Sequence, residues 1–305
     1  MKIIFSTLFI SIFISVSAQK DSVRVLFYNV ENLFDTKDDP LKNDNEFLPH
    51  SKKNWNNFKL NDKINKIAKV IAAGNFPDVI GLCEVENDSV LFKLVQHSIL
   101  YKKKYQIIHF ESPDQRGIDC ALLYKTKKFD VLSMKPNPVK IDGRKTRDIL
   151  STTLVHKKDT FVFFVNHWPS RYGGKKKSVP KRISAANQLK LLMDSVVINY
   201  PKRKVISMGD FNDEPRDSSL QILKNYSNRS DTFKGTIKYK GKWQVFDQFI
   251  CSENLNYNSR VLNWDFLMEE DKTYGNQKPF RTYYGPRYNG GFSDHLPILL
   301  IFYAP

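Results

Sequence analysis

The chain has 305 residues, of which 41% are hydrophobic and 26% are charged, and its formal net charge is +16. These values are ordinary for a globular chain that buries a core, in one large domain or two small ones. Its three cysteines exclude a framework of paired disulfides, and none is spaced from another Cys or a His as in a zinc site.

The first residues have the pattern of a signal peptide. Lys2 precedes an almost wholly apolar run from Ile3 to Val16, and small residues follow up to Ala18. The alternative is a membrane anchor, but the run is shorter than the roughly 20 apolar residues that span a bilayer. We therefore expect residues 1–18 to be removed, leaving a secreted or periplasmic protein without stable membrane insertion. Because Lys2 is the only charged residue removed, the net charge falls from +16 to +15.

Short apolar segments alternate with amphipathic ones along the rest of the chain. Helices are predicted where apolar residues recur every three or four positions: Leu60–Gly74, Ser89–Leu100, Ile183–Ile198 and a short one at Ser218–Asn225. Strands are predicted at Val23–Val30, Val79–Val85, Ile118–Tyr124, Ile149–His156, Thr160–Asn166, Lys204–Met208, Val245–Cys251 and Ile298–Phe302.

This order predicts a layered α/β fold with sheets inside and helices outside. The hairpin around Lys157–Asp159 favours mixed sheets over purely parallel ones. Three stretches are predicted to be loops: Asp35–Phe58, Pro169–Pro180 and Glu253–Phe292. The last is too long for an idle connection. No linker or repeat interrupts the chain, so we expect one domain over residues 19–305, monomeric by default.

Cys83 and Cys120 lie within the predicted strands, where we interpret them as small buried hydrophobic residues. The sequence leaves it undecided whether one disulfide joins two of Cys83, Cys120 and Cys251.

Polar side chains recur where the predicted strands end. If the strands are neighbours, these side chains converge on one rim of the sheets, which is where α/β folds place their sites. They are Asn29, Glu84, Asn166, His167, Asp210, Asn212, Asp247, Asp294 and His295.

This set suits phosphoryl chemistry with a hard divalent cation. Carboxylate and amide oxygens of Glu84, Asp294 and Asn29 are the ligands that Mg²⁺ prefers, with Mn²⁺ as the alternative. A carboxylate such as Asp210 orients and deprotonates an attacking water, and protonated histidines and an Asn amide stabilise the transition state. Each residue alone is weak evidence, because Asn is common in turns and Asp-His pairs are common on surfaces. Asp247 inside an apolar run stands out, because a buried unpaired carboxylate is costly.

Seven segments in order give the chain a resemblance to the endonuclease/exonuclease/phosphatase superfamily, which includes pancreatic deoxyribonuclease, abasic-site endonucleases, sphingomyelinases and inositol polyphosphate phosphatases. The segments are Phe27-Tyr28-Asn29-Val30-Glu31-Asn32, Gly81-Leu82-Cys83-Glu84-Val85, Arg116 to Tyr124, Val165-Asn166-His167-Trp168, Met208-Gly209-Asp210-Phe211-Asn212-Asp213, Val245 to Ile250, and Phe292-Ser293-Asp294-His295-Leu296-Pro297.

The resemblance implies a four-layer α/β sandwich, in which two mixed sheets pack face to face with helices outside. It also implies a role for each residue. Asn29, Glu84 and Asp294 match the metal site, with Glu84 as principal ligand. His167, Asp210, Asn212, Asp247 and His295 match the catalytic set, in which Asp210 activates water and Asp247 orients His295. Arg116 and Asp119 match a substrate-facing segment more loosely, and Arg171 is placed to clamp a phosphate.

Three functions compete for this site. A secreted nuclease is favoured by the mature charge of +15, by Lys175–Lys177 and by a tyrosine-rich loop with Tyr274, Tyr283, Tyr284 and Tyr288, because aromatic rings and cations line nucleic-acid grooves. The tyrosines also suit packing of the loop onto the body, and the lysines suit a solvated loop. A phosphatase or phosphodiesterase for lipid head groups or small phosphates is the alternative. A non-catalytic binding module is remote, because the catalytic set is complete.

Overall fold

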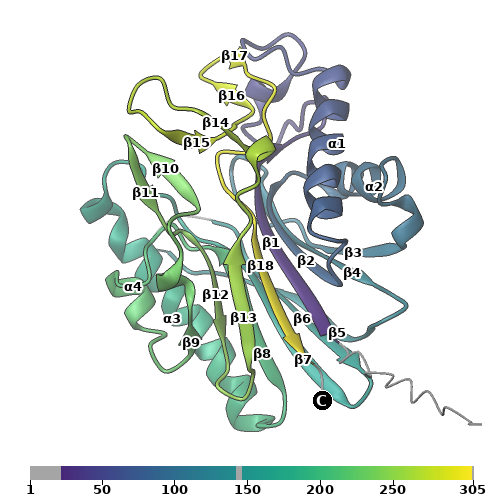
Figure 1. Ribbon diagram of the computed structural model, residues 1–305, viewed down its shortest axis with the longest axis vertical. Coiled ribbons are helices and arrows are strands. Elements are labelled where there is room, and N and C mark those ends of the chain that lie inside the picture. The colour runs from purple at the N-terminus through teal and green to yellow at the C-terminus, as the bar shows by residue number, and fades with distance from the viewer. Residues whose placement is uncertain (1–21, 142–145, 304–305) are drawn as a thin grey trace, which may run out of the picture.

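The computed structural model describes residues 22–141 and 146–303 of the chain. Two six-stranded sheets lie face to face at its centre, with helices on the outside, so that the fold is a four-layer α/β sandwich (Figure 1). The predicted signal peptide at 1–18 lies outside the described residues. Within the described residues, no helix is both long enough and apolar enough to cross a membrane.

The first sheet contains one parallel strand pair among antiparallel ones. Its strand order is β13-β18-β1-β2-β4-β3, and β1 runs parallel to β2. The bounds are β1 Ser22–Leu33, β2 Val79–Val85, β3 Tyr105–His109, β4 Asp119–Lys125, β13 Tyr257–Val261 and β18 Ile298–Tyr303.

The second sheet repeats this plan. Its order is β5-β6-β7-β8-β12-β9, and β7 runs parallel to β8. The bounds are β5 Asp130–Asn137, β6 Ile149–His156, β7 Asp159–His167, β8 Lys204–Asp210, β9 Ser227–Asn228 and β12 Asp247–Cys251. Both sheets are therefore mixed, as the sequence predicts.

Alternation along the strands separates three hydrophobic layers. In β1, Val25 and Phe27 point into the core between the sheets, whereas Leu26 and Tyr28 point to the outer core under two helices. Those helices are α1 (Asn57–Ala73) and α2 (Asp88–Gln96). The outer face of the second sheet packs on α3 (Lys175–Asn199), with the short α4 (Ser218–Gln221) nearby.

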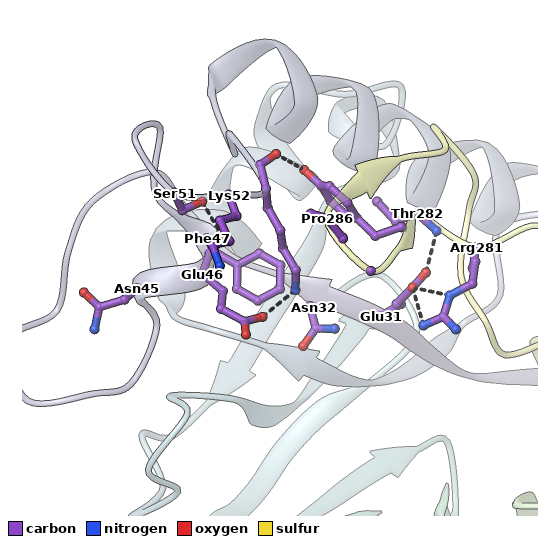
Figure 2. Close-up of a pocket in the computed structure, with 13 residues that line it drawn as sticks. Glu31, Asn32, Asn45, Glu46, Phe47, Ser51, Lys52, Arg281, Thr282 and Pro286 are labelled. Carbon is purple, nitrogen blue, oxygen red and sulfur yellow. Dashed lines mark hydrogen bonds and ion pairs between the residues drawn. The ribbon is translucent and has the colours of Figure 1, made fainter.

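Three small hairpins form a rim at one end of the sandwich. They are β10–β11 (Ile237–Tyr239 and Lys242–Gln244), β14–β15 (Met268–Glu270 and Gln277–Pro279) and β16–β17 (Tyr283–Tyr284 and Arg287–Tyr288). Single 3₁₀ turns lie at Asn45–Phe47, Tyr101–Lys103, Ser230–Thr232 and Asp265–Leu267. Segment 45–53 and the β16–β17 hairpin enclose a pocket of about 710 Å³ (Figure 2).

Several predicted boundaries are wrong. The stretch Glu253–Phe292 is not one loop, because it contains β13 and two of the rim hairpins. Helix α3 begins at Lys175, inside the predicted loop Pro169–Pro180, and accommodates Pro180 in its second turn. The second helix ends at Gln96 rather than Leu100, and α4 is one turn long. Strands β3, β5 and β9 and the hairpin β10–β11 were not predicted either.

All three cysteines are buried free thiols in the core between the sheets. Cys83 and Cys120 are register partners on β2 and β4. Burial raises the pKa of each thiol, which keeps them protonated and unreactive.

Candidate active site

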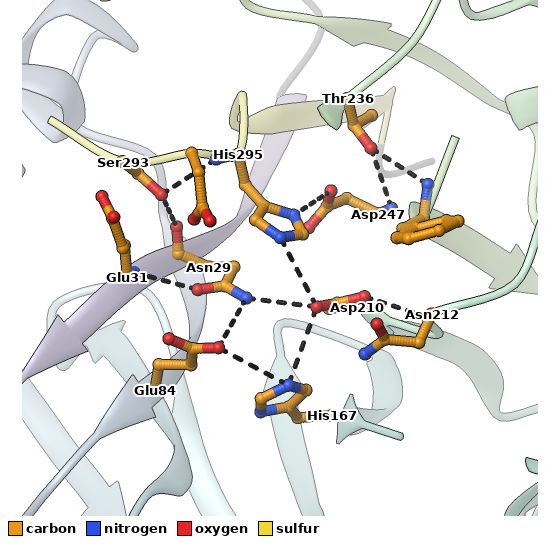
Figure 3. A network of polar contacts seen from close by, with 12 residues as sticks. Asn29, Glu31, Glu84, His167, Asp210, Asn212, Thr236, Asp247, Ser293 and His295 are labelled. Atoms are coloured by element: carbon orange, nitrogen blue, oxygen red, sulfur yellow. Dashed lines mark hydrogen bonds and ion pairs between the residues drawn. The ribbon is translucent and has the colours of Figure 1, made fainter. Parts of the chain in front are cut away.

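The two parallel strand pairs deliver polar side chains to the same end of the sandwich. Asn29 lies in β1 and Glu84 in β2, whereas His167 ends β7 and Asp210 ends β8. Figure 3 shows these side chains, together with His295, turned toward one another across the line where the sheets meet. The convergence predicted from the strand ends is therefore present.

Asp210 is the centre of the cluster. Its Oδ2 accepts a hydrogen bond from Asn29 Nδ2 at 3.1 Å and lies 3.7 Å from Nε2 of both His167 and His295. Its Oδ1 accepts the backbone N–H of Asn212 at 2.9 Å. Burial raises the pKa of Asp210 to about 7, although His295 acts to lower it. A carboxylate with such a pKa suits a general base that works near neutral pH.

His295 is held by a second carboxylate. Its Nδ1 lies 2.7 Å from Asp247 Oδ2, and Asp247 is fully buried at the start of β12. Thr236 Oγ1 accepts the backbone N–H of Asp247 and so fixes the start of that strand. Burial works against a charged imidazole, but Asp247 and Asp210 outweigh it and raise the pKa of His295 well above its usual value. The two carboxylates therefore favour the charged imidazolium form of His295.

His167 is in the opposite state. Burial lowers its pKa well below the usual value, and Arg147, Arg116 and His295 lower it further. Asp247 holds His295 through Nδ1, whereas Nδ1 of His167 is buried without a hydrogen-bond partner in the described structure, so a protonated His167 stays a prediction. The surroundings favour a neutral and a charged imidazole on opposite sides of Asp210 (Figure 3).

Glu84, Glu31 and Asp294 are the carboxylates on the metal-site side of the cluster, although no contact joins Glu84 to the other two among the described residues. Glu84 adopts a left-handed backbone with φ of 62°, and its Oε2 accepts the backbone N–H of Asn32 at 3.0 Å. Glu31 is buried nearby, and burial followed by repulsion from Asp294 raises its pKa. Carboxylate oxygens are the ligands that a hard divalent cation prefers.

Asn29 faces Glu84 with its nitrogen. Nδ2 lies 3.4 Å from Glu84 Oε1, and Oδ1 accepts the backbone N–H of Glu31 at 2.9 Å. In this arrangement Asn29 holds the carboxylates of Glu84 and Asp210 in place, and its role as a metal ligand stays a prediction. Asp294 lies at the edge and pairs with Arg281 at 3.2 Å.

The remaining predicted site residues lie further out. Asn212 donates from its side chain to Trp168 O at 3.0 Å, next to His167. Arg116 is half exposed and acts electrostatically on His167. Arg171 is committed to Asp213 and Asp217, at 3.0 and 2.7 Å, and Asp119 is buried against His109 at 3.2 Å. The substrate contacts predicted for Arg116, Arg171 and Asp119 stay predictions.

Sequence reasoning missed three charged residues. Arg281 joins Glu31 to Asp294, with 3.2 Å to each. Arg147 donates to the carbonyls of His167 and Trp168, at 3.2 and 2.8 Å. For Glu31 the signal was its place in the Asn29 segment. In the sequence, Arg147 is a single cation beside a predicted strand and Arg281 is a single cation within a predicted loop, so neither pattern indicated a site residue.

A buried carboxylate between two histidines, with further carboxylates nearby, is an arrangement that suits phosphoryl transfer. The chain belongs to the Endonuclease/Exonuclease/phosphatase family, whose model matches residues 24–303. Members of this family are phosphoesterases that generally depend on a divalent metal. No curated protein sequence matches the chain.

Solved structures of the same fold include truncated TDP2 from Caenorhabditis elegans, which is 17% identical with a TM-score of 0.63 over 93% of this chain and 98% of that one. The human Nocturnin catalytic domain with bound sulfate is 18% identical, with a TM-score of 0.61 over 94% and 98%. A mannosyl-6-phosphatase of Bacteroides thetaiotaomicron is 16% identical, with a TM-score of 0.61 over 91% and 98%. At these identities the likeness shows the fold.

Proposed function

We propose that the protein is an exported, Mg²⁺-dependent phosphoesterase that hydrolyses phosphate esters by in-line attack of water. The observation that supports this most is Asp210, whose carboxylate lies 3.7 Å from a neutral His167 and from a charged His295. Mn²⁺ is the alternative cation. Export rests on the signal-peptide pattern of residues 1–18.

The residues divide the reaction between them. Asp210 accepts the proton of the attacking water, whose oxygen forms the new bond to phosphorus while the ester P–O bond breaks. His167, neutral, donates a hydrogen bond to a phosphoryl oxygen, and His295, charged, stabilises the negative charge that develops. The leaving oxygen takes a proton from solvent. Glu84 and Asp294 would hold the cation, which supplies Lewis-acid polarisation of the phosphate when bound.

Three of the four tyrosines give little support to a nucleic-acid groove, whereas Tyr274 is exposed. Tyr283 is buried with its hydroxyl donating to Lys53 O at 3.0 Å, and the hydroxyls of Tyr284 and Tyr288 bond to Glu269 and Asp62. These rings pack the rim hairpins onto the body. We therefore place small phosphate esters first. This agrees with the mannosyl-6-phosphatase among the structures of this fold.

A nuclease remains the second candidate because of the charge. The chain carries +16 overall, and Lys176 and Lys177 are exposed at the start of α3, close in sequence to His167. Such a surface attracts polyanions. A nuclease of this kind binds its substrate with a steep dependence on salt, whereas turnover of a small phosphate ester changes little.

One assay panel tests the proposal. It contains supercoiled plasmid, single-stranded RNA, sphingomyelin, a hexose phosphate and an aryl phosphodiester, each with Mg²⁺ and with chelator. The expected result is hydrolysis of small esters that chelator abolishes and that Mg²⁺ or Mn²⁺ restores. His295→Ala is the inactive control. Activity that survives chelator, or that equals wild type in His295→Ala, would refute the mechanism.

A further inference from the structure

The pocket of about 710 Å³ is lined by Glu31, Asn32 and Arg281, which contact Asn29, Glu84 and Asp294 of the candidate site (Figure 2 shows the pocket). Segment 45–52 forms one side, and Arg281, Thr282 and Pro286 form the other. Its inner wall is Glu31 and Asn32, whose backbone N–H groups hold Asn29 Oδ1 at 2.9 Å and Glu84 Oε2 at 3.0 Å. The pocket is therefore within reach of a phosphate ester bound at Glu84.

Three polar side chains of the pocket have no partner of their own. Among the residues that the structure describes, the side chains of Asn32, Asn45 and Lys52 make no hydrogen bond or ion pair, although all three line the pocket. Each amide offers two donors and a carbonyl acceptor, and the ammonium offers three donors. Groups that both donate and accept are what neighbouring hydroxyls require.

Other polar groups of the pocket are already committed. Glu31 accepts from Arg281 and from the backbone of Thr282, and Lys53 pairs with Glu46 at 2.8 Å. These bonds hold the walls in place. The hydrogen-bonding capacity left for a ligand is therefore that of the two amides and Lys52.

The aromatic rings of the pocket offer no face for a nucleobase. Phe47 stacks on Phe34 with centroids 4.2 Å apart, and Lys53 Nζ lies 4.1 Å from the centroid of Phe47 over the ring, so its two faces are covered. Tyr283 is buried and packs edge-on against Tyr288 at 5.3 Å. Proteins that bind nucleobases without sequence preference stack them on aromatic rings with an exposed face, and this pocket has no such ring.

We propose that this pocket receives a polyhydroxylated alcohol group, so that the substrate class is a sugar phosphate rather than a nucleic acid. The inference rests on the proposed phosphoesterase function and names its substrate. Asn32 and Asn45 bind the hydroxyls, and Lys52 binds a hydroxyl or a further anionic substituent. The volume lies within the roughly 300–1,000 Å³ typical of small-ligand sites.

The test compares a hexose 6-phosphate with an aryl phosphate too small to reach Asn45 and Lys52. Asn45→Ala and Lys52→Ala are both at exposed positions outside the catalytic set, so neither threatens the fold. We expect each to raise KM for the sugar phosphate about 3- to 10-fold, the loss of one hydrogen bond to a hydroxyl, with turnover of the aryl phosphate unchanged. Lys102→Ala, also exposed, is the matched control.

The outcomes separate the two proposals. Failure of wild type to hydrolyse either the aryl phosphate or the sugar phosphate defeats the phosphoesterase itself. If both variants hydrolyse the aryl phosphate normally and keep the wild-type KM for the sugar phosphate, the pocket assignment is refuted, but the phosphoesterase function is not. Preference of wild type for single-stranded DNA or a nucleoside 5′-phosphate over the sugar phosphate also overturns it.

Discussion

The bond between Asp247 and His295 allows the sharpest test of the catalytic geometry. Asp247→Asn keeps the shape of the side chain but removes its charge. The bond is 2.7 Å long and fully buried, and a hydrogen bond to a charged partner of this kind contributes about 1.5–3 kcal/mol. If the imidazolium is needed mainly in the transition state, kcat/KM falls by that amount, which is about 10- to 150-fold.

The fold should survive this change. Asp247 Oδ1 is buried and has no hydrogen-bond partner in the described structure, so removing the charge does not break a second contact. We expect the melting temperature to stay within a few degrees of wild type. The assay is the hydrolysis of an aryl phosphodiester at saturating Mg²⁺, with thermal unfolding of the same sample.

Asp159→Asn is the matched control. Asp159 pairs with Lys204 at 2.8 Å at the opposite end of β7 from His167, so the same chemical change there should leave kcat/KM unchanged. A folded Asp247→Asn protein with wild-type kcat/KM would refute the reasoning that a charged His295 stabilises the transition state.

Three further predictions concern the metal site and the stability of the fold. Glu84→Gln should abolish the binding of Mg²⁺ or Mn²⁺ in calorimetry while the protein stays folded; unchanged binding would remove Glu84 as the principal ligand. Arg182→Met removes the fully buried partner of Asp213 at 2.7 Å and leaves it paired with Arg171 alone, so urea unfolding should show a loss of up to about 3–5 kcal/mol, and an unchanged midpoint would contradict this. The pKa of His109 is raised because Asp119 and Asp88 outweigh burial. Its contribution to stability is therefore complete below its unfolded pKa and is lost as pH rises through the folded pKa. His109→Gln should flatten the decline in urea stability between pH 6 and pH 9, and a wild-type slope in that variant would refute the assignment.

The buried strands were predictable from the sequence because their apolar runs are long and continuous. The four missed strands of the two sheets, β3, β5, β9 and β13, lie at sheet edges. β5 exposes its residues from Asp130 to Lys135, so it carries no alternation of apolar and polar positions. The start of α3 was missed because Lys175–Lys177 and Pro180 look like a loop, and only the packing of the buried Ser178 and Arg182 supports a helix there.

The catalytic residues were predictable for a different reason. Asn29, Glu84 and Asp210 follow apolar strands directly, so the strand order alone brings them together. Arg281 is separated from Glu31 by 250 positions, and its contact depends on how the rim hairpins pack. The state of His167 depends on Arg147 and on burial, neither of which can be read from a local pattern.

The site contains residues from both sheets, so the turnover rate depends on how the two sheets are aligned. Asn29 belongs to one sheet and Asp210 to the other, so their 3.1 Å bond reports any sliding of the two layers. The layers nearly touch at Gly81, where a methyl group would meet Met208 Sδ at 2.8 Å. A displacement of about 1 Å costs an enzyme on the order of 100-fold in rate. Substitutions that repack the core between the sheets, even at Phe161 far from the site, should therefore abolish activity while the protein is still folded.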